Sequence, residues 1–232
     1  SYLEEALDQM IHITGFWGKA HPLESGGPTW HPLAYHCLDV AAVADALLAR
    51  SPRKLAHLAA LCGTEPLTVR RFLVLLIALH DIGKFSRDFQ AKSEVGWQTA
   101  ALGPRKEPPA GVRHDAIGYA MLDCEDAEIA HLNGLRDAFA PDWLHSEFAA
   151  LWSSVTGHHG QPALEPAGPW HFGLRNGASE AANDFVADAI SLLSPITPIP
   201  QIDERTLAVL SWAVAGLTVI SDWIGSSEAW FP

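Results

Sequence analysis

Apolar residues recur at helical spacing along most of this chain. In residues 33–50 they stand three or four positions apart, which places them on one face of an α-helix; they are Leu33, Cys37, Val40, Ala44, Leu47 and Leu48. The same pattern predicts further helices over residues 53–62, 67–83, 115–124, 143–157, 178–194 and 203–224. The alternating pattern of strands is hard to find, so we predict an all-α fold.

Turn-forming residues separate these predicted helices. Pro66 and Thr68 suit the start of the third helix, and Asp203 suits the start of the last one. Residues 92–113, rich in Gly, Pro and charge, and the Pro-rich residues 194–200 are predicted to be loops. Because no repeat or change of composition divides the 232 residues, we expect a single globular domain over residues 1–232.

The most apolar segment, Leu207 to Ile220, is about 14 residues long. A bilayer span needs about 20 residues, so we predict a buried core helix and no membrane partner. The acidic, amphipathic start "SYLEEALDQM" is not typical of a signal peptide. The cysteines are odd in number and far apart, which indicates reduced, cytosolic core residues rather than a disulfide framework or a Cys-based zinc site; they are Cys37, Cys62 and Cys124.

The charge balance restricts the possible functions. Lys and Arg number 15 against 27 Asp and Glu, a net charge of −12, which argues against a domain that holds nucleic acid by its own surface charge. The chain has no phosphate-binding loop, because Lys19 and Lys84 follow glycines but precede Ala20 and Phe85, and it has no Gly-x-Ser-x-Gly motif. Its 12 histidines invite a search for metal ligands.

The strongest chemical signal is "LLIALHDIGKFS", residues 75–86. Its apolar run ends at His80 and Asp81, and an unpaired buried carboxylate is costly. Adjacent helix positions differ by about 100°, so both side chains can point towards one common site. Lys84, three positions after Asp81 and four after His80, lies on the same face of the helix. Gly83 leaves room for a close approach of another segment. A divalent cation beside neutral imidazoles would compensate the charge of Asp81.

Four further segments carry candidate ligands. "YHCLD", "VRHDA", "TGHHGQ" and "ISDWIGS" contain, in that order, His36, His114, the pair His158 and His159, and Asp222. Most have an ordinary alternative when taken singly, namely a hydrogen-bonded core histidine, a solvated histidine or a helix cap. The adjacent histidine pair is harder to explain by packing alone.

The order His…His-Asp…His…His-His…Asp resembles that of the HD superfamily of metal-dependent phosphohydrolases. The narrower resemblance is to the HD nuclease domain of the type I CRISPR-associated helicase-nuclease, and "FWGKA", "HPLAYHCLDVAAVA" and "SDWIGSSEAWFP" share it. It spans about Phe16 to Pro232 and implies a helical bundle with long loops around a central dinuclear metal site. That family usually continues into a superfamily-2 helicase, so we expect either an excised domain, which the ending "EAWFP" favours, or a stand-alone nuclease subunit.

The resemblance implies two metal ions that share one carboxylate. The first would be held by His36, His80, Asp81 and Asp222, and the second by Asp81, His114, His158 and His159. Imidazole-rich ligation suits Mn²⁺, Fe²⁺, Ni²⁺ or Co²⁺ better than Mg²⁺. Such a centre would hydrolyse single-stranded DNA as an endonuclease or exonuclease. Lys84 would stabilise the transition state, or would simply be a surface lysine at a helix C-terminus.

The resemblance also implies partners. A superfamily-2 helicase, in the same or a partner chain, would feed single-stranded DNA to the site, and the full-length protein would act with a CRISPR RNA-guided surveillance complex. Ser226 is a candidate phosphate ligand and Trp97 a candidate base-stacking platform. Asp39 and Asp115 either orient neighbouring imidazoles or are solvated. A basic strip that would guide DNA towards His114 consists of Lys92, Arg105, Lys106 and Arg113.

Two alternatives remain open. The motif "HDIGK" also fits an HD phosphohydrolase of small nucleotides, such as a deoxynucleotide triphosphohydrolase, a guanosine-tetraphosphate hydrolase or a cyclic-dinucleotide phosphodiesterase. The last group usually follows its paired histidines with Glu and an Asp-Gly-x-Gly-Tyr-Pro stretch, whereas this chain reads "HHGQPALEP". The second alternative is a non-catalytic docking module with a structural metal, which would predict a damaged ligand set.

Overall fold

Helices make up most of the structure, a computed structural model that describes residues 13–20, 30–100, 102–106, 113–123, 129–166, 170–175, 177–227 and 229–231. The all-α prediction is therefore confirmed, with one small sheet added. In chain order the elements are β1 (Trp17–Ala20), β2 (Trp30–Pro32), α2 (Leu33–Ala49), α3 (Pro52–Leu61), α4 (Pro66–Ala78), η2 (Ile82–Phe85), α5 (Arg87–Gln90), α6 (Glu94–Thr99), α7 (His114–Ala120), η3 (Met121–Asp123), α8 (Ala130–Asn133), α9 (Leu135–Phe139), α10 (His145–Thr156), η5 (Trp170–Leu174), α11 (Ala178–Leu193) and α12 (Glu204–Gly225).

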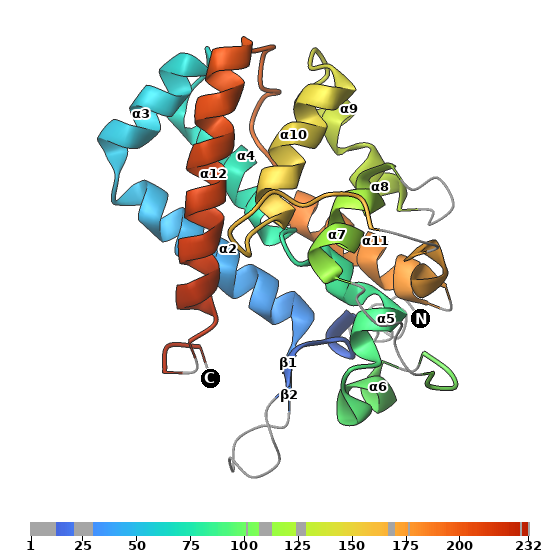
Figure 1. The fold of residues 1–232 in the computed structure, drawn as a ribbon. Helices are drawn as coiled ribbons and strands as arrows, with labels where there is room; N and C mark the ends of the chain where they lie inside the picture. The colour runs from blue at the N-terminus through green and yellow to red at the C-terminus, as the bar shows by residue number, and fades with distance from the viewer. Residues whose placement is uncertain are drawn as a thin grey trace, which may run out of the picture.

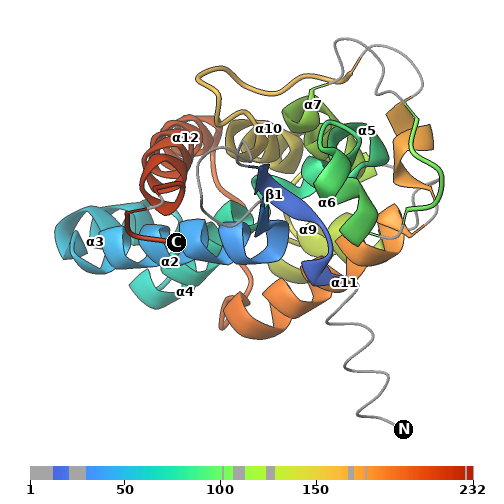
Figure 2. The same cartoon turned by 90° about the horizontal axis from the view of Figure 1, so that it is seen from below.

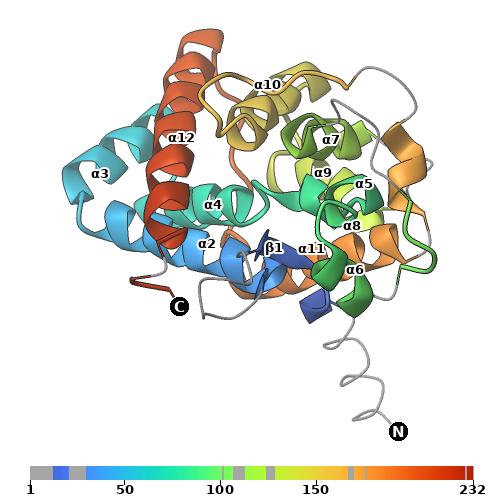
Figure 3. The ribbon, with the colours of Figure 1, turned by 60° about the horizontal axis from the view of Figure 1, so that its bottom comes forward.

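Helix α4 lies at the centre of the fold. It contacts α2, α3, α10, α11 and α12, and Figure 3 shows α12 crossing it and α2 running alongside it. Every residue from Phe72 to Leu79 is buried, because a helix that is apolar on all sides is stable only when other elements cover it. The end of α4 is therefore held rigidly in the middle of the core.

Helix α12 crosses α2 at close range (Figure 1). It begins as predicted at Asp203, whose carboxylate accepts a hydrogen bond from the Thr206 amide at 2.7 Å. At its other end, a Cβ on Gly225 would lie 3.0 Å from the Val40 backbone. The glycine thus permits the two helices to approach closely where the turn of α12 that carries the candidate ligand Asp222 meets α2.

The prediction that the last helix is buried is wrong for one of its faces. Helix α12 has 22 residues, close to the predicted range 203–224, and among the described residues it is the helix long and apolar enough to cross a membrane by length and composition. Leu210 and Val214 are buried against the bundle, whereas Trp212 is 81% exposed and Trp223 is 73% exposed. Only one side of α12 contributes to the core.

The α-helix predicted over residues 67–83 ends early, at Ala78. The chain then turns through bonds three residues apart, from the His80 amide to Ile77 and from the Lys84 amide to Asp81, and continues as η2. A Cβ on Gly83 would overlap the His114 carbonyl oxygen and lie 2.5 Å from the Gly118 amide nitrogen. The turn therefore packs its backbone directly against α7, which explains the glycine.

The sequence patterns did not predict the small sheet or the short helices. Strands β1 and β2 pair antiparallel, with Lys19 opposite His31, and β1 is anchored because Gln90 donates to the Trp17 carbonyl at 2.9 Å. The segment predicted as a loop over residues 92–113 contains α6, capped by Ser93 at 3.1 Å from the Gly96 amide. Residues 107–112 of that segment, like Cys124, lie outside the described residues.

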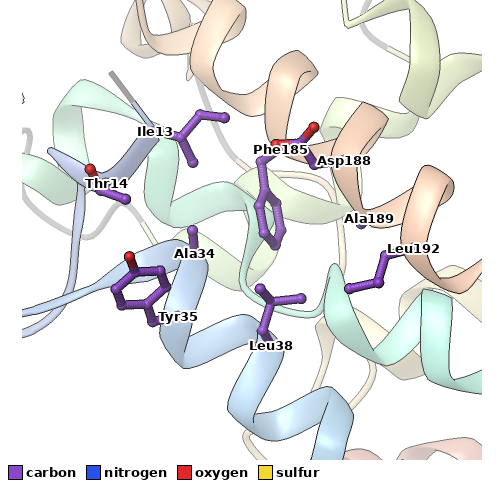
Figure 4. Close-up of a pocket in the computed structure, with 9 residues that line it drawn as sticks. All are labelled: Ile13, Thr14, Ala34, Tyr35, Leu38, Phe185, Asp188, Ala189 and Leu192. Atoms are coloured by element: carbon purple, nitrogen blue, oxygen red, sulfur yellow. The ribbon is translucent and has the colours of Figure 1, made fainter. Parts of the chain in front are cut away.

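An apolar hollow of about 130 Å³ lies between α2 and α11 (Figure 4). Its walls include Ile13, Tyr35, Leu38 and Phe185, and it contains none of the candidate metal ligands. The free thiols Cys37 and Cys62 are buried.

Candidate metal centre

Five distant segments of the chain bring the candidate ligands together around the end of α4. They are His36 on α2, His80 and Asp81 in the turn after α4, His114 at the start of α7, His158 and His159 just after α10, and Asp222 in the last turns of α12. All seven side chains contact at least one other member of the set. The helices that carry them are long-range neighbours in the bundle, so the fold itself assembles the centre.

Asp81 lies in the middle of the centre, and its side chain is 1% exposed. Its Oδ2 atom is 3.0 Å from His36 Nε2 and 3.4 Å from His80 Nε2. Its Oδ1 atom faces the other way, 3.2 Å from His114 Nε2 and 3.4 Å from His158 Nε2. Each of the two oxygens of the Asp81 carboxylate thus faces its own pair of imidazoles.

Asp222 completes the Oδ2 side of the centre. Its Oδ1 atom lies 3.5 Å from His36 Nε2 and 3.8 Å from His80 Nε2. Ser226, predicted as a phosphate ligand, donates its hydroxyl to this same oxygen at 2.9 Å. The structure therefore places Ser226 where it orients Asp222.

His159 completes the Oδ1 side. Its Nε2 atom is 3.1 Å from His114 Nε2, and His114, His158 and His159 form one of the groups in which ligand atoms lie within 4.8 Å of one another. His36, His80 and Asp81 form a second such group. His159 is more exposed than the other histidines of the centre, so the Oδ1 side is the one that solvent reaches.

Unsatisfied atoms show that these residues fit a divalent cation. Among the described residues, His80 Nε2 and Asp81 Oδ1 are buried without a hydrogen-bond partner. Such atoms are rare because burial without a partner costs free energy. The His80 ring is held in place by a contact of 2.9 Å between its Nδ1 and the Ile77 carbonyl oxygen, which turns Nε2 towards the carboxylates. This is how metal-binding histidines are usually oriented.

The spacing of the donor atoms also suits a metal ion. Adjacent ligands of an octahedral ion with bonds of about 2.1 Å stand about 3 Å apart. The separations of 3.0 Å from His36 Nε2 and 3.2 Å from His114 Nε2 to the Asp81 oxygens are close to that value. The arrangement needs little movement to accept a cation on either side of Asp81.

Burial keeps two of the imidazoles neutral. It lowers the pKa of His36 to about 4 and that of His158 to about 3, so their nitrogen lone pairs are free at neutral pH. Burial also lowers the pKa of His80, but Asp81 and Asp222 outweigh it and raise the value to about 9. Although burial alone would raise the pKa of Asp81, Lys84 and His80 hold it well below its usual range.

Two lysines stand beside the centre. Lys84 Nζ lies 2.5 Å from Asp81 Oδ2 and donates to the Gly18 carbonyl at 3.3 Å. Lys19 Nζ lies 3.5 Å from the Gly225 carbonyl oxygen, and burial lowers its pKa while the charge of Asp222 opposes that effect. Sequence reasoning gave Lys19 no role. The available signal was a lysine within the apolar segment "FWGKA".

A polar cleft of about 450 Å³ opens beside the Oδ1 side. Its walls are Lys92, Arg113, His114, Asp115, His159 and Gln161. The Arg113 guanidinium binds the Asp115 carboxylate through two nitrogens, at 3.0 Å and 2.5 Å. The positive charge of Arg113 is therefore largely balanced, whereas Lys92 forms no ion pair with any residue that the structure describes.

Some predicted functional residues have other surroundings. Trp97 is 6% exposed, donates to the Gly103 carbonyl and lies under the Arg87 guanidinium, so it is not a base-stacking platform. Arg105 of the predicted basic strip donates to the Ala91 carbonyl at 2.6 Å. Asp39 lies 3.3 Å from His31 rather than against His36.

A family model described as "Cas3, HD domain" matches residues 17–231. The chain belongs to the Cas3 HD domain family. The family expected from the motifs is thus confirmed, and the helical core around the histidines and aspartates is its HD domain.

Two curated relatives of this Cas3 HD domain are CRISPR-associated endonuclease/helicase Cas3 proteins. The Escherichia coli (strain K12) protein is 33% identical over 238 residues, which cover 95% of this chain and 26% of the relative. The Thermus thermophilus protein is 29% identical over 223 residues, which cover 93% of this chain and 22% of the relative. This chain therefore spans about a quarter of the length of the curated relatives it matches.

Solved structures agree with this fold. The Thermus thermophilus cas3 HD domain in the presence of Ni²⁺ matches with a TM-score of 0.61 and 25% identity, covering 96% of this chain and 80% of that one. A chain in a structure described as "CRISPR RNA-guided surveillance complex, pre-nicking" matches with a TM-score of 0.69 and 24% identity, covering 93% of this chain and 25% of that one.

Proposed function

We propose that this chain is a single nuclease domain that hydrolyses phosphodiester bonds in single-stranded DNA with two divalent metal ions, in CRISPR interference against foreign DNA. The observation that carries the proposal is the position of Asp81, whose two carboxylate oxygens face separate sets of imidazoles. One buried carboxylate placed in this way can bridge two ions. A structural metal site needs only one closed set of ligands.

The proposed ligand sets follow the two sides of the centre. The first consists of His36, His80, Asp81 and Asp222, and the second of Asp81, His114, His158 and His159. The excess of imidazole over carboxylate ligands favours Mn²⁺, Fe²⁺, Ni²⁺ or Co²⁺ over Mg²⁺. Bound ions would supply Lewis-acid stabilisation of phosphodiester oxygens and would lower the pKa of the attacking water.

The protein's own residues would position and stabilise the substrate. Lys84 Nζ, next to Asp81 Oδ2, is placed to offer its charge to the phosphoryl oxygens as negative charge develops. Ser226 holds Asp222 in orientation through their 2.9 Å hydrogen bond. Lys92 and Arg113 in the polar cleft would bind a flanking phosphate of the strand that enters on the side of His159.

The acidic balance of the chain suggests how the strand arrives. With a net charge of −12, the domain would bind DNA weakly by itself. The relatives are described as endonuclease/helicase proteins, so we propose that a superfamily-2 helicase, in the same or a partner chain, delivers the single strand. The surveillance-complex structure supports action of the full-length protein with an RNA-guided complex. We place this action in the prokaryotic cytoplasm, without a membrane partner.

One experiment separates this proposal from its alternatives. The protein is stripped of metal, and Mn²⁺, Ni²⁺, Co²⁺ or Mg²⁺ is added singly with circular single-stranded DNA, linear single-stranded DNA, duplex DNA, nucleoside triphosphates or cyclic dinucleotides. We expect cleavage of single-stranded DNA with a transition metal, and the circular substrate reports endonuclease activity. Hydrolysis of nucleotides alone would overturn the proposal in favour of a small-nucleotide phosphohydrolase. Metal binding without any hydrolysis would indicate a docking module.

A further inference from the structure

Strand β1 holds Lys19 beside the Oδ2 side of the metal centre. Three hydrogen bonds between Trp17 and Gln90, of 2.9 Å, 3.0 Å and 3.1 Å, fasten the strand. A Cβ on Gly18 would lie 3.3 Å from the Cβ of His36, so the strand packs directly against α2. Figure 2 shows β1 between the end of α12 and α5, and the view in Figure 1 agrees. The backbone of Lys19 is therefore fixed next to a candidate metal ligand.

The ammonium group of Lys19 has no close partner among the described residues. Its Nζ atom lies 3.5 Å from the Gly225 carbonyl oxygen, which is long for a hydrogen bond, and it forms no ion pair with any residue that the structure describes. Lys84, by contrast, lies 2.5 Å from Asp81 Oδ2. Lys19 is half-buried, and removing a weakly paired charge from water costs free energy. Its surroundings therefore suit an added anion.

The nearby carboxylates do not fill this role. Three of them act on Lys19 by their charge, and each has a closer partner of its own: Asp39 lies 3.3 Å from His31, Asp81 lies 2.5 Å from Lys84, and Asp222 lies 2.9 Å from Ser226. Asp81 and Asp222 are also proposed metal ligands, and two divalent ions outweigh their charge. In the metal-loaded centre Lys19 would thus face a surplus of positive charge, which an anion compensates.

We propose that Lys19 binds a phosphate of the substrate strand on the Oδ2 side, next to the scissile phosphate. This deepens the proposed function and rests on it, because the strand is the substrate proposed there. Lys84 contacts the carboxylate between the two sides, whereas Lys19 lies at the edge of the centre, by the end of α12. Asp222 keeps 20% of its side chain exposed at that edge. Phosphate contacts of this kind fix the position of a strand.

A strand that crosses both ions would be held on both flanks. Lys92 and Arg113 line the polar cleft on the Oδ1 side, and Lys19 stands on the Oδ2 side beside Gly225. The scissile phosphate would lie between the two contacts, over the carboxylate of Asp81. Lys19 and Lys92 are therefore expected to bind different flanking phosphates of the same substrate.

The alternative is a structural lysine at the C-terminal end of α12, where positive charge is favourable. Such a lysine needs a close contact with the last carbonyl groups, and the observed separation from the Gly225 oxygen is 3.5 Å. A structural role would also affect every substrate equally, because the end of the helix is present whichever substrate binds. A phosphate contact affects only substrates that carry a flanking phosphate.

The test uses the smallest substrates that contain or lack a flanking phosphate. The metal-loaded protein is given bis(p-nitrophenyl) phosphate, thymidylyl-thymidine, or thymidylyl-thymidine with an added 5′ or 3′ phosphate. We expect each added phosphate to lower KM about tenfold, as a charge-assisted hydrogen bond does. Lys19→Gln should lose the gain from one added phosphate and Lys92→Gln the gain from the other. The kcat of Lys19→Gln with bis(p-nitrophenyl) phosphate should stay unchanged.

Two further variants serve as controls. Lys54→Gln removes the same charge from an exposed position on α3, which carries no candidate ligand, and should keep both gains. Lys19→Arg keeps the charge and should restore most of the gain that Lys19→Gln loses. An undiminished gain from both phosphates in Lys19→Gln would overturn the proposal. An equal loss on bis(p-nitrophenyl) phosphate and on the dinucleotides, or a loss of bound metal, would overturn it in favour of a structural role.

A binding measurement separates this proposal from the proposed function. The anisotropy of a fluorescent, phosphorothioate-linked oligothymidylate is measured with the metal-loaded protein at several salt concentrations. We expect Lys19→Gln to weaken binding about tenfold and to reduce the slope of log affinity against log salt by about 0.7, with no change in Lys54→Gln. Binding that depends on Lys19 without hydrolysis of any substrate would leave the phosphate contact standing and overturn only the nuclease. Hydrolysis with binding indifferent to Lys19 would overturn the contact alone.

Discussion

At the scale of single residues, Asp81 determines what the centre can do. A buried carboxylate with 1% side-chain exposure is tolerable only when cations or hydrogen bonds surround it. Lys84 and His80 provide that charge in the metal-free protein and hold the pKa of Asp81 well below its usual range despite burial. The same carboxylate faces imidazoles on two sides, which is why we propose that the residue hardest to bury also bridges two metal ions.

Replacing Asp81 by Asn keeps the volume of the side chain and removes the charge. We expect both metal ions to bind more weakly and cleavage to fall at least about 100-fold, because the proposed bridging ligand also sets the position of both ions. Metal content by mass spectrometry of the native protein and the rate on circular single-stranded DNA measure the effect. Asp45→Asn, which removes a surface partner of Arg70, is the control. Full activity of Asp81→Asn would contradict the bridging role.

Lys84 and Lys92 are expected to act on different kinetic constants. Lys84→Gln removes the cation at 2.5 Å from Asp81 and should lower kcat by about 100-fold with metal content unchanged, as the loss of a transition-state contact does. Lys92→Gln removes a cation from the polar cleft and should raise KM with little effect on kcat. Loss of metal from Lys84→Gln would assign Lys84 a structural role instead.

At the scale of elements, the turn between α4 and η2 determines the geometry of the centre. The turn begins where α4 is buried on every side and ends against the backbone of α7 at Gly83. A displacement of this short segment would therefore also displace His114, which lies at the start of α7. The rigid helix fixes one side of the centre, and the close backbone contact fixes the other.

Gly83→Ala and Gly216→Ala test this contact as a pair. A methyl group at Gly83 overlaps the His114 carbonyl oxygen, so we expect a loss of about 1–3 kcal/mol in the free energy of unfolding and weaker binding of the metal near His114. A methyl group at Gly216 meets nothing within 4 Å and should stabilise the helix by about 0.5–1 kcal/mol. Urea denaturation measures both. A neutral Gly83→Ala would show that α7 is free to move away.

At the scale of the whole molecule, the centre links five segments that span most of the described chain. His36 and Asp222 stand far apart in the sequence, and their 3.5 Å contact joins the first long helix to the last. A metal ion bound between such segments stabilises the folded state, because the unfolded chain cannot present the same ligands together. Metal binding is therefore expected to be visible in global stability.

Chelation should lower the melting temperature, and metal should restore it. Each site occupied at about 100 times its dissociation constant adds about 2.7 kcal/mol to the free energy of unfolding. We expect Mn²⁺, Ni²⁺ and Co²⁺ to raise the melting temperature at lower concentrations than Mg²⁺, with a stoichiometry of two by calorimetry. Asp81→Asn should lose most of this rise. A melting temperature insensitive to every metal would contradict a metal centre.

The sequence predicted the long helices because their signal is local. The apolar periodicity around Val40 and Val186 determines which face of each helix is buried, regardless of which helix packs against it. The observed α2, α10, α11 and α12 accordingly begin and end within a few residues of the predicted ranges. The early end of α4 at Ala78 was missed because the apolar run continues to Leu79 and Ile82 while the backbone turns. Strand β2, of three residues, is too short for a pattern.

The sequence by itself determined which side chains are available for the chemistry, because "HDIGK", the paired histidines and "SDW" are unusual as residue types and in their order. Only the tertiary structure decided that Asp81 faces imidazoles on two sides, that Trp97 is covered, and that one face of α12 is open. The physical reason is that helical periods arise from neighbours along the chain. Burial, orientation and contact distance depend on segments that meet only after folding.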